Sequence, residues 1–513
     1  MERTRTSNSI RNSATSITTQ VLTVIMDFVV KTIFIRVLGS EYLGINGLFA
    51  NIITLLSLAD LGIGLAIPYS LYKPLADKDE KRIKVLMNFY KKVYTCIGLV
   101  VLFIGLSLTP FLDLFIKERP NIPNLELIYI LFASHSALSY FFVYKRFLIE
   151  SDQKGYIISK ITFICSLGLN IARVTLLLLT KNYILFLFCS IVFVLIQNFW
   201  YSHKANKLYP YIKEKTNEKI SKEDKNEITK NIKALFIYKI GNVVANGTDN
   251  IIISKWIGLV AVGIYSNYLL IINSLANVVN QIFSAITSSI GNLVAKDNDR
   301  SLNVYEKLNF FNFYIYSLCS ICLYVLINPF INIWLGQDYL LSNFVSILLA
   351  INLYIAGMQS VTNSFRTAYG LFWIAKYRPI VMIILNIIIS IILVKPFGVA
   401  GVIIGTILSR LFTTAWLDPY IVYKNGFKES PINYYKKYIY YFIIFFLSCI
   451  TLGKLTSYIN ISNIIIWILI AILTLIVYNL IIILLFRKKE EFKYFYEKGL
   501  NIFKNITKKI NRA

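Results

Sequence analysis

The chain has few of the residues on which metalloproteins and hydrolytic enzymes depend. Its 513 residues include two histidines, six cysteines and 27 acidic residues, against 53 lysines and arginines. His135 and His203 are too few for a usual zinc site, and the cysteines lie in apolar runs, where we expect packing roles. No Walker A sequence, dinucleotide loop or catalytic constellation is present, so we expect neither an enzyme nor a bound cofactor. No cleavable signal is expected either.

Apolar residues dominate the composition of the chain. They make up 56% of the chain, and the mean hydropathy is +0.61. The apolar runs are continuous rather than alternating and about twenty residues long, which predicts membrane-spanning helices rather than a barrel. We therefore predict an all-α membrane protein with about fourteen transmembrane helices. The predicted spans are 15–38, 42–70, 84–109, 125–145, 156–178, 183–203, 232–254, 258–295, 306–330, 340–366, 377–395, 399–423, 436–453 and 462–486.

The net charge of +26 is unevenly distributed along the chain. About 40 of the lysines and arginines fall in the loops after every second predicted span or in the terminal segments, which is the positive-inside pattern. This distribution argues against a nucleic-acid partner, predicts contact with anionic membrane lipids and places both termini in the cytoplasm. A break in the 42–70 helix is expected near Gly62, Gly64 and Pro68.

An internal repeat divides the chain into two halves. The first copy reads Arg36-Val37-Leu38-Gly39, four residues and Gly44-Ile45, and the second reads Lys255-Trp256-Ile257-Gly258, four residues and Gly263-Ile264. Each half would hold six helices, so the halves are parallel repeats. The expected parts are a lobe at 1–205, a cytoplasmic linker at 206–231, a second lobe at 232–424, two additional helices within 425–486 and a basic cytoplasmic tail at 487–513.

Several predicted helices carry polar side chains at helical spacing, so that each set shares one face. The same two helices of each half are polar on one side, and we expect these faces to line a wet central cavity. A charge at the bilayer centre costs about 2.5–3.5 kcal/mol, which favours contact with water or with an opposite charge. The candidate cavity residues are Lys31, Asp60, Arg173, Lys239, Asn246, Asp249, Asn273, Asn277, Asn280 and Arg410.

Purely structural roles are the alternative for several of these residues. Asp27 and Lys31 are four residues apart and could pair with each other, while Lys239 could reach the membrane interface with its long side chain. The asparagines of the 258–295 helix could form hydrogen bonds between helices.

Four stretches of the sequence carry a resemblance to a known family, namely Lys31–Phe49, Leu58–Gly64, Tyr69–Ala76 and Phe397–Thr406. Over about residues 10–486 the chain resembles the Wzx-type polysaccharide flippases, whose superfamily also holds multidrug MATE exporters and lipid II flippases. The resemblance implies two six-helix bundles with two extra helices. It also implies a cationic cavity, for which Lys31, Arg173, Lys239 and Arg410 are available.

The function that this resemblance implies is movement of oligosaccharide repeat units, linked to undecaprenyl diphosphate, across a bacterial plasma membrane for capsule or exopolysaccharide synthesis. A polysaccharide polymerase and glycosyltransferases would be further partners. Three alternatives remain: a MATE-like exporter of cations, a lipid II flippase, and a scaffold for glycan assembly that transports nothing. The sugar composition and the coupling ion are not readable from the residues.

Overall fold

The computed structural model describes residues 5–56, 63–152, 154–214, 247–296, 300–371, 374–459 and 461–497, with four isolated positions between 220 and 229. Two compact units are present, Met1–Ser266 and Asn267–Ala513. Throughout the described residues the regular structure is helical, without a strand. The predicted all-α membrane fold is therefore confirmed.

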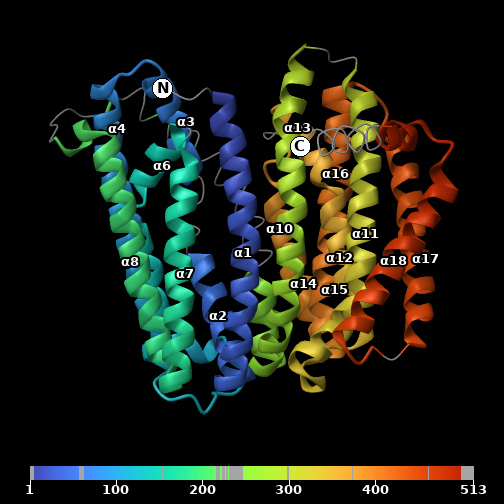
Figure 1. Cartoon of the computed structure of the whole chain (residues 1–513), viewed down its shortest axis with the longest axis horizontal. Helices are drawn as coiled ribbons and strands as arrows, with labels where there is room; N and C mark the ends of the chain where they lie inside the picture. The colour runs from blue at the N-terminus through green and yellow to red at the C-terminus, as the bar shows by residue number, and fades with distance from the viewer. Residues whose placement is uncertain are drawn as a thin grey trace, which may run out of the picture. The chain divides into compact units, whose positions relative to one another are not determined.

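Unit 1 contains the helices α1 to α8 and the beginning of α10 (Figure 1). Their bounds are α1 Arg5–Leu38, α2 Ser40–Leu56, α3 Ile63–Ala76, α4 Glu80–Ser107, η2 Thr109–Leu114, α5 Leu125–Tyr140, α6 Tyr144–Ser151, α7 Gly155–Thr180, α8 Tyr183–Leu208 and η3 Pro210–Lys213. Residues 247–256 are also helical. The helix predicted over 42–70 is described as α2 and α3, and Gly64 and Pro68, near which a break was expected, lie within α3. Residues 57–62, which include Gly62, lie outside the described residues, as does half of the predicted linker at 206–231.

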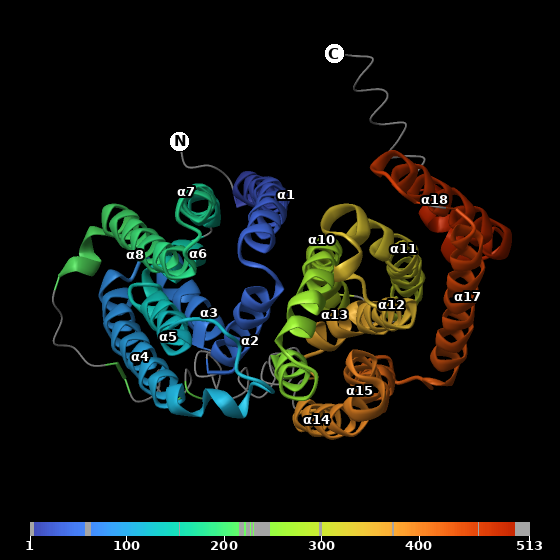
Figure 2. The same ribbon diagram turned by 90° about the horizontal axis from the view of Figure 1, so that it is seen from below.

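Unit 2 contains the rest of α10 and the helices that follow it. Their bounds are α10 Leu259–Lys296, α11 Ser301–Leu335, η4 Gln337–Tyr339, α12 Asn343–Met358, α13 Ser360–Ala368, α14 Arg378–Phe397, α15 Val399–Phe412, α16 Thr414–Ile421, the π-helical η5 Val422–Phe427, α17 Ile432–Ser457 and α18 Ile464–Phe486. Figure 2 looks along the helices and shows α17 and α18 beside α11, at the edge of this unit.

Ten described helices are long and apolar enough to cross a membrane, or eleven if the bent pair α5 and α6 is one span. These correspond to eleven of the fourteen predicted spans. The other three, at 15–38, 42–70 and 232–254, all include residues whose backbone or side chains are not described. The outward apolar side chains of α18, such as Ile465 (66% exposed) and Leu484 (68%), suit lipid contact.

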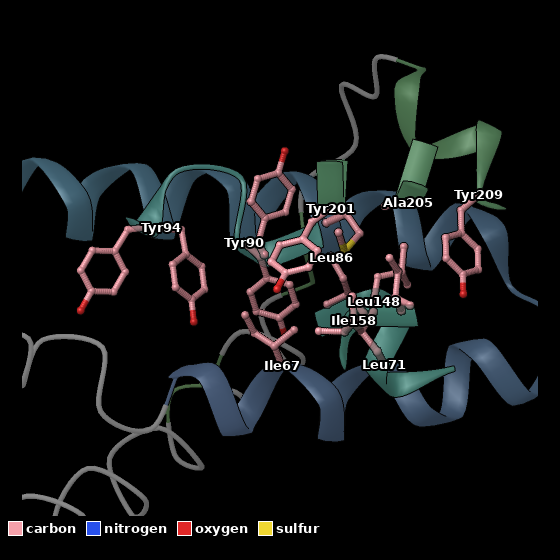
Figure 3. Close-up of a cluster of buried hydrophobic side chains, with 14 of the residues drawn as sticks. Ile67, Leu71, Leu86, Tyr90, Tyr94, Leu148, Ile158, Tyr201, Ala205 and Tyr209 are labelled. Atoms are coloured by element: carbon pink, nitrogen blue, oxygen red, sulfur yellow. The ribbon is translucent and has the colours of Figure 1, made fainter. Parts of the chain in front are cut away.

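A buried cluster at one end of unit 1 holds α3, α4, α6, α7 and α8 together (Figure 3). Ile67 and Leu71 of α3 pack with Tyr90 of α4 and Leu148 of α6. Burying these side chains holds the helices together, and it contributes about 25 cal/mol for every Å² of apolar surface that is removed from water. Three of the cluster's tyrosine hydroxyls have polar partners: Tyr209 Oη donates to Asp152 Oδ2 at 2.7 Å, and the hydroxyls of Tyr90 and Tyr201 lie within hydrogen-bond distance of those of Ser70 and Thr162.

The bend between α5 and α6 is stabilised by a side chain from α8. The two helices meet at 44°, and Phe142 between them has a φ of +68°. Such a break leaves helix carbonyls without their usual donors, which is costly away from water. Asn198 Nδ2 lies within hydrogen-bond distance of three of these carbonyl oxygens, those of Leu138 (3.2 Å), Ser139 (3.1 Å) and Phe141 (2.8 Å).

Candidate functional site

A cavity of about 250 Å³ lies within unit 1, between α1 and α7. These two helices are far apart in the sequence but side by side in the structure (Figure 2). The side chains around the cavity are basic, acidic, amide and aromatic. The lining residues are Asp27, Val30, Lys31, Phe34, Leu43, Asn46, Gly47, Asn170, Arg173, Phe186 and Ser266.

Lys31 extends from α1 to the beginning of α10. Its Nζ donates a hydrogen bond to the carbonyl oxygen of Ser266 at 2.7 Å. An ammonium group has three donors, so this contact fixes the head of the side chain and leaves donors for a ligand. A neutral carbonyl does not form an ion pair with the ammonium group.

Arg173 enters the same cavity from α7 and is held by α8. Its guanidinium lies over the ring of Phe186, 4.5 Å from the centroid, and its Nη2 donates to Ser190 Oγ at 2.5 Å. Its buried Nε has no hydrogen-bond partner among the described residues. Stacking on an aromatic ring orients the planar donor fork without neutralising it. The arrangement therefore presents a fixed cation with unused donors.

Asp27 lines the cavity one turn before Lys31 and is exposed. It makes no ion pair within 4.0 Å with Lys31 or Arg173, although both bases act on it electrostatically. The Asp27–Lys31 pair considered as an alternative is therefore not formed in this geometry. With one acid and two bases, the ionised cavity carries a net charge of +1.

Amide and aromatic side chains complete the wall. Tyr183 Oη donates to Asn46 Oδ1 at 3.1 Å, and the Tyr183 ring meets Phe34 edge-on with centroids 5.4 Å apart. Phe34 also meets Phe186 edge-on at 5.3 Å. This aromatic group connects Asn46 to the ring beneath Arg173, so the amide and the guanidinium are positioned by the same packing.

The structure brings together two of the ten predicted site residues, Lys31 and Arg173. Asp249 is buried in unit 1 but does not line this cavity. Asn273, Asn277 and Asn280 are exposed on α10 in unit 2, where Asn280 Oδ1 accepts a hydrogen bond from Tyr316 Oη at 3.0 Å. Arg410 is half-buried on α15. Asp60, Lys239 and Asn246 lie outside the described residues.

Other cavity residues were not among the predicted site residues. Asn46 follows the first copy of the repeat and belongs to none of the predicted polar faces. Phe186, and Ser190 which bonds Arg173 without lining the cavity, belong to an apolar helix for which no polar stripe was predicted. Ser266 contributes a main-chain carbonyl, for which the side-chain pattern gives no signal.

Unit 2 contains a buried ion cluster of three charged side chains. Asp418 of α16 is fully buried and forms ion pairs with Arg366 of α13, at 2.7 Å, and with Arg378 of α14. The two arginines are also buried, with exposed side-chain fractions of 2% and 9%. A shared carboxylate between two guanidinium groups ties three helices together, so we assign this cluster a structural role.

No protein-family model and no curated protein matches the sequence. The structure is similar to that of the lipid II flippase MurJ in an inward closed conformation, with a TM-score of 0.67 and 14% identity over 91% of this chain and 98% of MurJ. It is also similar to an inward-facing MATE family multidrug resistance transporter of the MOP superfamily, with a TM-score of 0.60 and 11% identity over 79% of this chain and 96% of that one.

A third similar structure is the MATE transporter VcmN of Vibrio cholerae, with a TM-score of 0.59 and 13% identity over 83% of this chain and 99% of that one. Identities this low carry information about architecture, and architecture alone does not assign a cargo. The chain is therefore a multi-pass membrane protein with the fold that these MurJ and MATE structures have.

Proposed function

We propose that this protein is a flippase, which moves an oligosaccharide carried on undecaprenyl diphosphate from the inner to the outer leaflet of a bacterial plasma membrane for surface-polysaccharide synthesis. One observation carries the proposal. Lys31 and Arg173, from helices distant in the sequence, line one cavity, and neither base has a carboxylate within 4.0 Å among the described residues. Two bases that make no ion pair, in a cavity with a net charge of +1, suit a diphosphate group.

The rest of the wall suits a sugar-bearing cargo. Asn46 and Asn170 offer both donors and acceptors, and Phe34 and Phe186 offer apolar faces beside them. A cavity that bound only a metal or an inorganic ion would have no need of this aromatic surface. The fold agrees with transport, since the similar solved structures are of a flippase and of transporters.

Alternating access supplies the mechanism. The predicted lobes at 1–205 and 232–424 would rock to open the cavity to one leaflet and then to the other, while the polyprenyl chain stays in lipid. Both termini and the linker would face the cytoplasm, as the loop charges predict. A membrane potential that is negative inside favours outward movement of an anion by about 2.3 kcal/mol per charge at 100 mV.

Asp27 favours a second candidate, an exporter of cations. A carboxylate that is exposed to the cavity and free of ion pairs within 4.0 Å is a group that a cationic drug would bind. Against this candidate, the two bases in the same cavity would repel such a cargo. The MurJ match also spans a larger share of this chain than the MATE matches do.

A clean deletion in the native host tests the proposal. Extraction and sizing of lipid-linked glycans, with measurement of surface polymer, should reveal accumulated undecaprenyl-linked repeat units and lost polymer. Complementation with the wild-type chain or with the Arg36→Gln variant should restore the polymer, because Arg36 is exposed on α1 and does not line the cavity. Unchanged glycan lipids with new sensitivity to cationic dyes would support the exporter instead.

A further inference from the structure

A larger cavity, of about 550 Å³, lies wholly within unit 2, where α11 and α17 end. This volume falls in the range of about 300–1,000 Å³ that small-molecule sites have. Its polar lining residues include Tyr324, Asn328, Asn332, Asn343, Thr456 and Tyr458. None of the described residues that line it is charged, in a chain with a net charge of +26. The cavity is therefore polar but neutral, in contrast to the cavity of unit 1.

Asn328 organises one wall through a saturated set of hydrogen bonds. Its Oδ1 accepts from Tyr268 Oη at 2.7 Å and from Ser346 Oγ at 2.9 Å. Its Nδ2 donates to the carbonyl oxygen of Leu341 at 3.0 Å and to Asn343 Oδ1 at 2.9 Å. Because Asn343 uses its oxygen in this contact, its amide nitrogen is left to donate elsewhere.

Other polar groups that line the cavity are not engaged in hydrogen bonds of this kind. The side chain of Asn332 and the hydroxyl of Tyr324 line the cavity, and no hydrogen bond joins either to the described part of the chain. Pro329 has no N–H, so the carbonyl of Val325, another lining residue, lacks its ordinary helical donor. The wall thus combines free amide groups, a hydroxyl and a main-chain acceptor.

Two tyrosine rings border these groups. A side chain on Gly453 of α17 would lie only 2.6 Å from a carbon of the Tyr324 ring, so the glycine makes room for that ring. Tyr458, just after α17, is 87% exposed. An aromatic ring beside donors and acceptors can receive the C–H face of a sugar while its hydroxyls form hydrogen bonds.

Helix ends of both signs border the cavity, since Asn343 is the first residue of α12. Asn332 lies in the last turn of α11, and Ser457 is the last residue of α17. The C-terminal end of a helix carries partial negative charge, which repels anions and attracts hydrogen-bond donors. The helix ends therefore do not select the ligand. A phosphate group is disfavoured because none of the described lining residues is basic, whereas the free amide and hydroxyl groups suit the hydroxyl groups of a neutral sugar.

We propose that this cavity is a binding site for a neutral carbohydrate, at the end of unit 2 that the loop charges predict to lie outside the cell. The inference rests on the proposed function, for which it would supply a place for the sugar portion of the cargo.

Saturation-transfer NMR on the full chain in nanodiscs, prepared without glycoside detergents, tests the proposal with maltose and with chitobiose as probes. We expect transfer from wild-type protein to at least one disaccharide. The Asn332→Leu and Tyr324→Leu variants should reduce it by about fivefold or more, since each removes a hydrogen-bonding group from the wall. Asn332→Gln, which keeps the amide, should retain part of the signal.

The Asn303→Leu variant is the matched control, since Asn303 is exposed at the opposite end of α11. It should leave the signal unchanged, and thermal unfolding and size exclusion identify any variant that does not fold. No transfer to wild-type protein, equal transfer to folded Asn332→Leu and Tyr324→Leu variants, or displacement of the sugar by inorganic diphosphate would each overturn the proposal. Lys31→Gln should retain sugar binding, so failure here is separable from failure of the proposed flippase function.

Discussion

Gly44 and Gly263, which are equivalent in the internal repeat, lie against each other where α2 meets the beginning of α10. A Cβ on Gly263 would be 3.2 Å from the backbone nitrogen of Gly44 and inside contact distance of the Ser40 carbonyl. A Cβ on Gly44 would collide in the same way with the carbonyl of Leu259, the repeat equivalent of Ser40. The two copies of the motif therefore pack reciprocally, through glycines that bring two backbones together.

We predict that Gly44→Ala lowers the thermal stability of the protein markedly, because the clashing atom is a main-chain oxygen that cannot turn aside. Overpacking of this kind costs about 1–3 kcal/mol. The measurement is the apparent Tm in detergent. Gly168→Ala is the matched control, since its Cβ would meet only the ring of Phe193, at 2.8 Å, which can move. Equal losses in the two variants would contradict the reciprocal packing.

Replacement of Arg173 by lysine should impair the proposed transport. Arg173→Lys keeps the positive charge but loses the planar donor fork that stacks on Phe186 and bonds Ser190. We expect surface polymer to fall about tenfold, close to the loss in Arg173→Gln, because one well-placed charged hydrogen bond is worth about 1.5–3 kcal/mol. Lys31→Arg, which can still bond the Ser266 carbonyl, should retain most polymer. Normal polymer in Arg173→Lys at equal protein levels would show that charge alone suffices.

Asp27 separates the two candidate functions. If the cargo is anionic, Asp27→Asn removes a repulsive charge, and surface polymer should stay within about twofold of wild type. If the cargo is a cationic drug, the same variant should abolish resistance to cationic dyes. Both phenotypes are measured in the deletion strain that carries the variant. Retained polymer with unchanged dye sensitivity is the expected outcome, and the reverse result would favour the exporter.

The ion cluster of unit 2 should be essential for stability. Asp418→Asn leaves Arg366 and Arg378 buried without their shared carboxylate, and breaking a buried pair costs about 3–5 kcal/mol. We expect a large fall in apparent Tm or loss of monodisperse protein. Glu150→Gln, which breaks the partly exposed pair with Arg146, should cost less than about 1 kcal/mol. Similar Tm values for both variants would contradict the structural role of Asp418.

The sequence predicted the helices well because membrane spans are determined by long apolar runs. The run from Ile464 to Phe486 forms α18 almost as predicted. Gly39 and Gly258, which occupy the same place in the repeated motif, both have a positive φ, which the repeat alone did not predict. The break between α5 and α6 was missed, since it depends on Asn198, a residue from another helix. Asp418 was missed too, although a lone carboxylate in an apolar helix is a usable signal.

The candidate site was predictable only in part. Helical spacing identified Lys31 and Arg173 as unusual, because bases in apolar helices need a polar environment. Their meeting at one cavity depends on α1 packing beside α7, and a pattern within one helix does not specify its neighbours. The expected central cavity between the halves stays a prediction, as do the predicted domain boundaries.

Transport by the purified protein tests the central claim most directly. The chain is reconstituted in vesicles with a polyprenyl-diphosphate-linked saccharide, and a glycosidase added outside reports how much of the lipid becomes accessible. We predict rapid access with wild-type and Arg36→Gln protein, and access near that of protein-free vesicles with the Lys31→Gln and Arg173→Gln double variant. Equal access with the double variant, or none with the wild type, would contradict the assignment of this cavity to an anionic lipid-linked sugar.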